Sequence, residues 1–301
     1  METIFLIGGS GFIGKNLVLH LKSKYRIVVF DKFIDEKFFE QTPEIDRYKI
    51  DLVNDQIPEH LESPEFIINL ASIVTAERDL SLFDGLISSN FKILLNLYNR
   101  FKTCSKLKIL MQFGSSEEYG SENSPFVETM RENPHSPYGL IKQLTTNTAL
   151  MLNQNYNFPI MVVRPGNLFG TFQSKDKFIP YIIGQLKHNL PLNVSPCEQK
   201  RDFIFVSDFS WALDCLIDNY KKCIGEIVNI SSGKSISLKS IIEICKTELN
   251  STSIVNYGAL PYREKEIMDL KCSVDKLSEI IGQPIHFDIE TRLKEYVFSV
   301  H

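Results

Sequence analysis

Two pairs of residues in this chain place a tyrosine four positions before a lysine, a spacing that can support proton transfer. Tyr138 and Lys142 lie in the run Ser136-Pro-Tyr-Gly-Leu-Ile-Lys142, and Tyr98 and Lys102 repeat the spacing. On a helix, residues four apart share a face, so the ammonium lies beside the phenol. This matters because a phenol with a pKa of about 10 is a poor base at neutral pH unless a cation stabilises its anion.

A strand end rich in hydroxyl and carboxyl groups distinguishes the two pairs. Residues 110–114 predict a buried strand that ends in Ser115-Ser-Glu-Glu-Tyr-Gly120. In a parallel sheet the carboxyl ends of the strands form the ligand crevice. Tyr138 begins the next predicted helix, whereas Tyr98 lies late in an earlier helix with no such strand end before it. We therefore predict that Ser115, Tyr138 and Lys142 are catalytic, and that Tyr98 packs or faces solvent.

A glycine-rich run stands at the first predicted junction between a strand and a helix. It reads Gly8-Gly-Ser-Gly11-Phe-Ile-Gly14. We expect Gly8 to permit a tight turn, Gly11 to let the backbone approach a pyrophosphate, and Gly14 to let helix and strand pack closely. Phe12 and Ile13 begin the helix, whose N-terminus supplies N–H donors to phosphates. The run predicts the phosphate-binding part of a dinucleotide site.

Acidic residues after the second and third predicted strands suit the adenosine half of a dinucleotide. Asp31 follows the strand at residues 26–30. Its carboxylate can accept both hydroxyls of a ribose and would repel a 2′-phosphate, which favours NAD over NADP although Lys32 follows directly. Asp51 and Leu52 follow the third strand, where Asp51 could hold the adenine amine. For each aspartate the alternative is an exposed carboxylate without a ligand.

Short β-rich runs alternate with helical patterns through the first half of the chain. The expected strands are residues 3–7, 26–30, 48–50, 66–69, 108–113 and 160–164. The clearest helices between them are residues 13–21, 88–102 and 138–154. This alternation predicts an α/β fold, a doubly wound parallel sheet of the Rossmann type with helices on both faces.

The rhythm becomes less regular after about residue 166. Helical patterns at residues 180–187, 206–220, 238–249 and 290–299 are joined by connectors that contain Pro, Gly and Asn. We therefore expect an NAD-binding domain at residues 1–166, with returning segments near 201–232. Residues 167–301 are expected to form mainly a smaller, interleaved α/β lobe that binds the substrate.

The composition describes an ordinary soluble globular protein. The 301 residues are 43% hydrophobic and 23% charged, with a formal net charge of −4. Basic residues run no longer than pairs, so nothing favours nucleic-acid binding, and no apolar stretch approaches a membrane span. The six cysteines form no C-x-x-C and no metal-ligand spacing. We expect reduced thiols, no metal site and a cytoplasmic location.

Together the motifs resemble those of the extended short-chain dehydrogenases/reductases that modify nucleotide sugars, over essentially the whole chain. They are the glycine run, Asn69-Leu-Ala-Ser72, Asn90, residues 115–120, Tyr138 with Lys142, Arg164-Pro-Gly-Asn-Leu-Phe-Gly170 and the run from Arg201 to Asp208. The resemblance implies NAD contacts by Leu70, Ala71, Ser72, Asn90 and Pro165. It also implies that Lys142 bonds to the nicotinamide ribose and lowers the pKa of Tyr138.

The resemblance further implies a hydride transfer coupled to a proton transfer. Tyr138 moves the proton of a sugar hydroxyl or ketone while Ser115 hydrogen-bonds the same oxygen, and hydride passes between that carbon and the nicotinamide. Such a step requires an acid–base group with a tuned pKa and donors already in place for the developing oxyanion.

The substrate implied by the resemblance is a nucleotide diphosphate sugar, linked to GDP, CDP, dTDP or UDP. In relatives, the asparagine of a motif like Arg164-Pro-Gly-Asn167 and the arginine of one like Lys200-Arg201-Asp-Phe contact the phosphates or nearby groups. Arg201 and Arg263 are candidate diphosphate clamps because a guanidinium fork matches phosphate oxygens, or each forms an ion pair instead. The remaining predicted substrate contacts are Thr75, Ser116 and Lys177.

Two motifs point to different members of the group. Lys177-Phe-Ile-Pro180 and the run from Gly258 to Met268 look most like 4-keto-6-deoxyhexose reductases such as CDP-abequose synthases. Those reductases commonly use NADPH, whereas Asp31 favours NAD. Ser115-Ser-Glu117 matches the Ser/Thr-x-Glu of 4,6-dehydratases, in which the glutamate helps to eliminate water, but Ser116 replaces the aspartate usual in many of them. Glu117 is therefore either a catalytic residue or an acidic loop residue.

Three chemistries share this machinery. An NAD-dependent oxidoreductase at carbon 4 of the sugar, a 4-dehydrogenase or 4-keto reductase in polysaccharide or capsule precursor synthesis, ranks first. A 4-epimerase ranks second and a 4,6-dehydratase third. A silent NAD(H)-binding protein is a remote alternative, since it would have little reason to keep Ser115, Tyr138 and Lys142 together. The helices at 88–102 and 138–154 would form a four-helix contact in relatives, so we expect a homodimer or tetramer.

Overall fold

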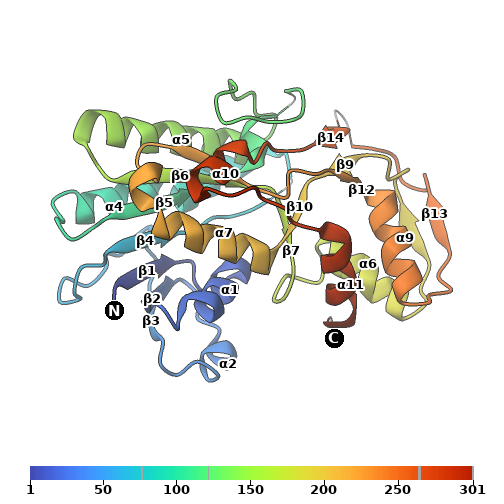
Figure 1. The fold of residues 1–301 in the computed structure, drawn as a ribbon, viewed down its shortest axis with the longest axis horizontal. Helices are drawn as coiled ribbons and strands as arrows, with labels where there is room; N and C mark the ends of the chain where they lie inside the picture. The colour runs from blue at the N-terminus through green and yellow to red at the C-terminus, as the bar shows by residue number, and fades with distance from the viewer. Residues whose placement is uncertain (76, 121, 264–265, 300–301) are drawn as a thin grey trace.

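Seven parallel strands form the central sheet, in the order β11-β6-β5-β4-β1-β2-β3 (Figure 1). The computed structural model describes residues 1–75, 77–120, 122–263 and 266–299. The strands are β1 (Thr3–Ile7), β2 (Arg26–Asp31), β3 (Asp46–Lys49), β4 (Phe66–Asn69), β5 (Ile109–Phe113), β6 (Ile160–Pro165) and β11 (Ile227–Ile230). All residues of β1, β4 and β5 are buried, because helices cover both faces of the sheet.

Successive strand residues enter two separate cores on opposite faces. Ile4 and Leu6 of β1 join one core, and Phe5 and Ile7 join the other. The first core is closed by α1 (Phe12–Leu21), α7 (Val206–Asp218) and α10 (Asp275–Ile281). The second is closed by α4 (Ile93–Phe101) and α5 (Pro137–Tyr156). The sheet is thus the middle layer of three.

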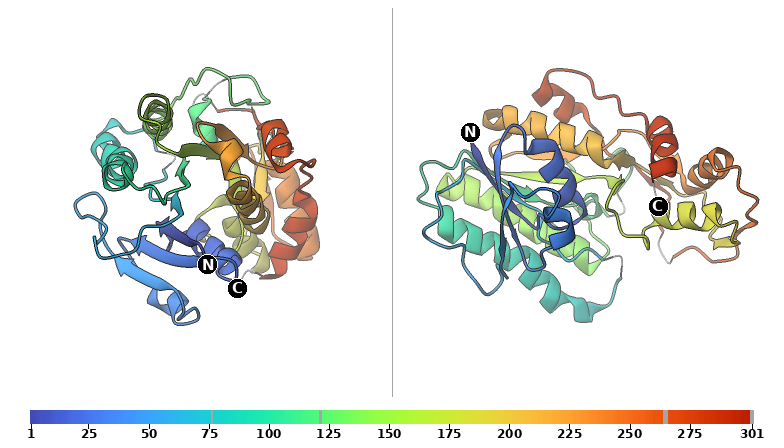
Figure 2. Two further views of the ribbon diagram at one scale, coloured as in Figure 1. Left: turned by 60° about the vertical axis from the view of Figure 1, so that its left-hand side comes forward. Right: turned by 90° about the horizontal axis from the view of Figure 1, so that it is seen from below.

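A third core lies in a lobe beyond one end of the sheet (Figure 2). Its helices are α6 (Phe178–Lys187), α9 (Leu238–Glu248) and α11 (Ile289–Ser299). Short strands pair around them: β7 (Asn167–Phe169), β8 (Leu192–Val194), β9 (Lys200–Arg201), β10 (Phe203–Phe205), β12 (Ile236–Ser237), β13 (Val255–Tyr257) and β14 (Asp269–Leu270). The short helical segments elsewhere are α2 (Glu36–Phe39), η1 (Leu80–Leu82), α3 (Phe83–Leu86), η2 (Ile87–Lys92), η3 (Ser116–Glu118) and α8 (Tyr220–Cys223).

The predicted doubly wound parallel sheet is confirmed, and its first six strands lie within two residues of the predicted bounds. The single helix expected at 88–102 is wrong in detail, since η2 forms wide π turns before α4 begins. In η2 the Nδ2 of Asn90 donates to the Leu86 carbonyl at 3.0 Å. Such π segments occur often at functional sites.

The chain returns to the sheet more extensively than expected. Besides β11 and α7, the short helix α10 packs Leu277 and Ile280 into the first core. The sequence shows this contact weakly because a seven-residue helix carries too few periodic positions. None of the helices in the described ranges is long and apolar enough to cross a membrane. The same ranges contain no cluster of His, Cys, Asp and Glu suited to a metal, and all six cysteines are free thiols.

Candidate active site

The glycine run forms a tight turn between β1 and α1. Gly8 has a φ of +80°, and a Cβ there would lie 2.9 Å from the Ala71 nitrogen. A Cβ on Gly14 would lie 2.5 Å from Gly9 Cα, so its close approach is to the turn itself rather than to the strand that we expected. A Cβ on Gly11 would touch only the Gly8 carbonyl, at 3.4 Å.

This turn fits a pyrophosphate. Gly11 is the N-cap of α1 and has no side chain, so no side-chain hydrogen bond caps the first turn of the helix. The first N–H groups of a helix lack partners within the helix, and with the dipole they favour an anion there. Phe12 and Ile13 supply the first of these groups, at the exposed side of the turn.

Asp31 lies against the glycine turn. Its two carboxylate oxygens accept the backbone N–H groups of Ser10 at 2.9 Å and Phe33 at 3.1 Å. Burial raises the pKa of this carboxyl, and the backbone donors oppose the shift. Lys32 Nζ lies 3.2 Å from Asp51 Oδ2, so the charge of Lys32 is directed to Asp51 rather than to Asp31. The two carboxylates predicted for the adenosine half therefore line neighbouring strand ends.

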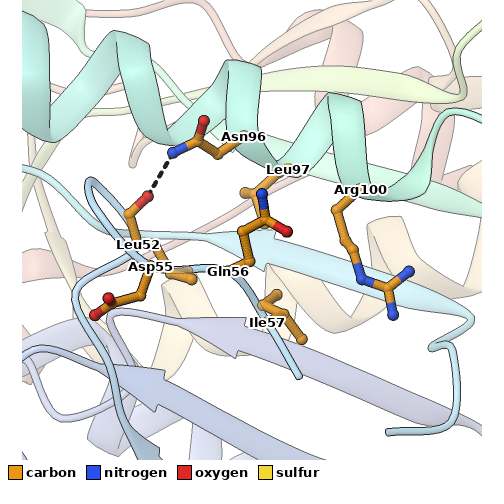
Figure 3. A pocket seen from close by; sticks show the side chains of 7 residues that line it. All are labelled: Leu52, Asp55, Gln56, Ile57, Asn96, Leu97 and Arg100. Atoms are coloured by element: carbon orange, nitrogen blue, oxygen red, sulfur yellow. Dashed lines mark hydrogen bonds between the residues drawn. The ribbon is translucent and has the colours of Figure 1, made fainter. Parts of the chain in front are cut away.

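The loop that carries Asp51 and Leu52 is anchored by α4. Asn96 Nδ2 donates to the Leu52 carbonyl at 2.8 Å (Figure 3). The Leu52 side chain is buried in the second core and borders a small cavity of about 10 Å³, room for about one water molecule. Leu52 thus has a packing role whatever contact its backbone makes with a cofactor.

Ser115, Tyr138 and Lys142 come together at the carboxyl end of β5. Lys142 Nζ donates to the Phe113 carbonyl at 2.8 Å and lies 5.7 Å from the centre of the Tyr138 ring. Tyr138, Lys142 and Ser115 are 6%, 2% and 8% exposed. Ser136 begins α5 by accepting the Gly139 N–H at 3.0 Å. The predicted catalytic group is therefore buried and fixed by two elements.

Burial dominates the acid–base properties of this group. It lowers the pKa of Lys142 to about 8, and the charge of Glu118 opposes the shift. Burial also raises the pKa of Tyr138, the carboxylates Glu117 and Glu118 add to this, and the hydroxyls of Ser115 and Ser72 oppose it. The direction of this shift is opposite to the lowering of the Tyr138 pKa that the resemblance implies, and its main cause is burial.

The other residues predicted to contact NAD line the same edge of the sheet. Leu70 and Ala71 follow β4 beside Gly8, and Pro165 ends β6. Ser72 Oγ donates to Asn90 Oδ1 at 2.6 Å, which ties this loop to the buried Asn90 of η2. The carboxyl ends of β1, β4, β5 and β6 thus lie along the edge of the sheet where this fold binds its ligands.

Glu117 is held at the start of the helix that carries Tyr138. Its Oε2 accepts the Ser136 hydroxyl at 2.9 Å, and Ser136 is the N-cap of α5. Ser116 is buried beside it and begins η3. Glu117 therefore has a structural contact of its own, besides any role toward a substrate.

The two predicted phosphate arginines lie in the second lobe and differ in their surroundings. Arg201 forms an ion pair with Glu266 and donates to the carbonyls of Lys200 and Ile267 at 2.8 and 2.6 Å. Burial lowers its pKa, as does nearby Arg263, whereas Glu266 and Glu117 oppose the shift. Arg263 is exposed. A diphosphate on Arg201 would have to replace Glu266.

The remaining predicted substrate residues lie on three different elements. Asn167 begins β7, and its N–H donates to the Asp202 carbonyl at 2.9 Å. Lys177 is exposed at the N-terminus of α6, and Thr75 lies half-buried in the loop after β4. The motif from Gly258 to Met268 also includes Glu264 and Lys265, which lie outside the described residues.

Sequence reasoning gave no role to the buried ion pair behind Ser115. Glu118 and Arg164 are fully buried, and Arg164 also pairs with Glu132 at 2.5 Å. A signal was present, since Arg164 ends the apolar run Met161-Val-Val in a strand buried on both faces. A charge in such a strand requires a buried partner, which the sequence alone does not identify.

Comparisons with known proteins identify the family of this chain. The family model described as "NAD dependent epimerase/dehydratase family" matches residues 4–231. CDP-abequose synthase from Salmonella muenchen is 26% identical over 309 residues, which cover 98% of this chain and 96% of that protein. The dTDP-4-dehydro-6-deoxyglucose reductase of Escherichia coli is 26% identical over 276 residues and 84% of each chain.

The fold also matches solved structures. UDP-glucuronic acid 4-epimerase from Bacillus cereus, in complex with UDP-glucuronic acid and NAD, superposes with a TM-score of 0.90. The match covers 99% of this chain and 100% of that chain at 21% identity. At this identity the likeness establishes a shared fold, and the chemistry has to be argued from the residues.

Proposed function

Because the chain belongs to the NAD-dependent epimerase/dehydratase family, we propose that it is an NAD-dependent oxidoreductase acting at carbon 4 of a nucleotide-linked sugar. The proposed reaction is that of a 4-dehydrogenase or a 4-keto reductase. The observation that carries it is the buried group of Ser115, Tyr138 and Lys142, on the same sheet edge as the glycine turn. One relative is by name a reductase of a 4-dehydro sugar nucleotide, which supports the position of the chemistry.

NAD, when bound, supplies the hydride acceptor or donor. The α1 N-terminus at Gly11 would hold its pyrophosphate and Asp31 its adenosine ribose, with Asp51 toward the adenine. The nicotinamide half would lie against the edge of the sheet formed by Leu70, Ala71, Ser72, Asn90 and Pro165. The Lys142 ammonium, already fixed at the Phe113 carbonyl, is placed to reach the nicotinamide ribose.

The proton chemistry fits a reduction well. A raised pKa keeps the proton on Tyr138 at neutral pH, so Tyr138 can give it to a ketone oxygen as hydride arrives. The Ser115 hydroxyl beside it would donate a hydrogen bond to the same oxygen. By microscopic reversibility the same groups would serve oxidation once a bound cofactor and Lys142 favour the phenolate.

The second lobe would bind the nucleotide diphosphate sugar. Residues 1–166, with the returning segments near 201–232, would bind NAD. Arg201 and Arg263 would clamp the diphosphate, with Glu266 as a stand-in anion on Arg201 until the substrate enters. The remaining contacts between the phosphates and Tyr138 would come from Asn167, Lys177, Thr75 and Ser116. The products would serve polysaccharide or capsule synthesis.

A 4-epimerase is the second candidate and a 4,6-dehydratase the third. Epimerisation needs the same acid–base group and a keto intermediate that can turn over, so no residue here separates it from net oxidation or reduction. Dehydration needs a further acid, and the one candidate from the sequence motif, Glu117, already accepts a hydrogen bond from Ser136 at 2.9 Å. A silent NAD(H)-binding protein is disfavoured by the burial of a complete proton-transfer group.

Incubation of the purified protein with a panel of nucleotide sugars and their 4-keto derivatives, with NAD or NADH, tests the proposal. Net change in NADH absorbance with one substrate supports the oxidoreductase. An isomer without net NADH indicates an epimerase, and a product lighter by one water indicates a dehydratase. The Tyr138→Phe variant is the control, and turnover that survives in it would contradict the proposed acid–base group.

We also propose a homodimer or tetramer built on α4 and α5. Leu140, Leu144 and Met151 of α5 are 45%, 42% and 38% exposed, and Ile87 beside them is 39% exposed. An apolar helix face of this kind is typical of a subunit contact. Sedimentation should give at least twice the mass of one chain, and Leu144→Glu should lower it. A one-chain mass for the unaltered protein at micromolar concentration would contradict this.

A further inference from the structure

We propose that Glu118 is a positioning residue of this active site, which fixes the backbone of Ser115 and presents a buried negative charge to Lys142. The inference rests on the proposed function, because it concerns the same catalytic group. Glu118 follows Ser115 by three residues, and the predicted site did not include it.

The carboxylate of Glu118 is divided between two partners. Its Oε1 accepts the Ser115 N–H at 2.7 Å, and its Oε2 accepts Nε and Nη2 of Arg164 at 3.0 and 2.7 Å. Ser115 Oγ in turn accepts the Glu117 N–H at 3.2 Å. Both the backbone and the hydroxyl of Ser115 are therefore fixed by the single turn η3, and the glutamate anchors that turn to β6.

The strand end is built around this carboxylate. Gly114 lies between β5 and Ser115, and a Cβ there would collide with Glu118 Oε1 and lie 3.1 Å from Val162 Cγ1. Gly114 is itself paired with β6, since its N–H donates to the Val163 carbonyl at 2.8 Å. The absence of a side chain at Gly114 therefore provides the space that the Glu118 carboxylate occupies.

Charges of alternating sign run from the loop to the active site. Glu132 pairs with Arg164, Arg164 with Glu118, and Glu118 lies within electrostatic reach of Lys142 and Tyr138. The Arg164 guanidinium also stacks 4.7 Å from the centre of the Tyr119 ring. A buried charge is costly without a partner, so Arg164 favours the ionised Glu118, and Glu118 favours the ionised Lys142.

A purely structural ion pair would behave differently from a positioning residue. Glu132 provides the comparison, because it also binds Arg164 but neither touches Ser115 nor acts on Lys142. Removing either carboxylate weakens the hold on Arg164. Only the loss of Glu118 removes the charge that faces Lys142, and only Glu118 holds the Ser115 N–H.

The experiment compares Glu118→Gln with Glu132→Gln by NADH affinity from pH 6 to 10 and by turnover. Glutamine can still accept the Ser115 N–H but carries no charge. We expect Glu118→Gln to move the alkaline loss of NADH affinity about one pH unit lower and to reduce turnover at least about tenfold. Glu132→Gln should keep the unaltered profile. Equal profiles in both variants, with turnover within about twofold, would overturn the proposal.

Two further variants keep the proposal testable if Glu118→Gln does not fold. Glu118→Asp keeps the charge but shortens the reach to Ser115, so turnover should fall while the pH profile stays. Glu118→Gln combined with Arg164→Met removes the buried cation that has lost its fully buried partner and should restore the fold with the shifted profile. An unshifted profile in the folded double variant would overturn the proposal. If the unaltered protein binds no NADH, the proposed function itself fails, which is a separate result.

Discussion

The pairs Tyr98–Lys102 and Tyr138–Lys142 have the same spacing and nearly the same local geometry, yet we propose a catalytic role for only the second pair. The lysine nitrogen lies 5.9 Å from the tyrosine ring centre in the first pair and 5.7 Å in the second. Helix geometry alone explains this agreement. The spacing therefore determines the contact between lysine and tyrosine, whereas the surroundings determine the acid–base chemistry of the pair.

The surroundings of the two pairs differ in burial and in partners. Lys102 is exposed and donates to Asn99 at 3.4 Å, while the Tyr98 ring packs 5.2 Å from the ring of Phe158. Of the two predicted alternatives for Tyr98, packing or exposure to solvent, the half-buried ring favours packing. Tyr138 and Lys142 instead lie under a strand end, away from bulk water, where electrostatic interactions are stronger.

The largest contrast is expected from removing each phenol oxygen. Tyr138→Phe should lower turnover about 10³-fold, because the proton donor of the reaction is lost while the ring still fills its site. Tyr98→Phe should leave turnover within about twofold of the unaltered protein. Steady-state rates with the active nucleotide sugar, and NADH binding by fluorescence, measure both. Comparable losses in the two variants would show that the wrong tyrosine was chosen.

The lysines should differ in the effect of pH. Burial lowers the pKa of Lys142 to about 8, so its charge is lost as pH rises through 8. The kcat/KM for NAD, which reports the free enzyme, should therefore fall about tenfold per pH unit above that value. Lys142→Met should lose this dependence together with about 100-fold in kcat/KM at pH 7, and Lys102→Met should keep the profile. A flat profile in the unaltered protein would contradict the role of Lys142.

The packing role of Tyr98 can be tested through stability. Tyr98→Ala should lower the free energy of unfolding by about 2 kcal/mol, because it removes the half-buried ring and its contacts with the rings of Phe158 and Tyr156. Urea unfolding followed by circular dichroism measures this. The folded fraction should keep its turnover per molecule. A variant as stable as the unaltered protein would mean that the ring contacts contribute little.

The smallest effect concerns Asp31, the residue expected to select NAD for the site of Tyr138 and Lys142. Asp31→Ala should lower the preference for NAD over NADP about tenfold, because the carboxylate that accepts ribose hydroxyls and repels a 2′-phosphate is gone. Asp46→Ala is the matched control, since Asp46 is a half-exposed strand aspartate paired with Arg26. Dissociation constants for both dinucleotides measure the ratio. An unchanged ratio in Asp31→Ala would defeat the cofactor argument.

The elements that were predicted well have strong local patterns. Residues 66–69 form an uninterrupted apolar run ending in a polar residue, and β4 occupies the same bounds. The strand β11 was not predicted individually, because Ile227-Val-Asn-Ile is short and contains Asn229. In the fold Asn229 is buried and accepts the Tyr119 hydroxyl at 2.8 Å. A buried polar residue whose hydrogen-bond partner is distant in the chain interrupts the apolar pattern, so the strand cannot be recognised from its own residues.

The doubly wound fold and the glycine turn could be predicted from the sequence, which also favours Tyr138 over Tyr98 as the catalytic tyrosine. These rest on periodicity, on the special backbone freedom of Gly8 and on the order of motifs along the chain, all of which are local properties. Three contacts of carboxylates followed only from the tertiary structure: Glu118 pairs with Arg164, Glu117 accepts from Ser136, and Glu266 pairs with Arg201. Those contacts join residues that are far apart in the chain, and local sequence patterns do not show which strand ends and loops lie next to each other.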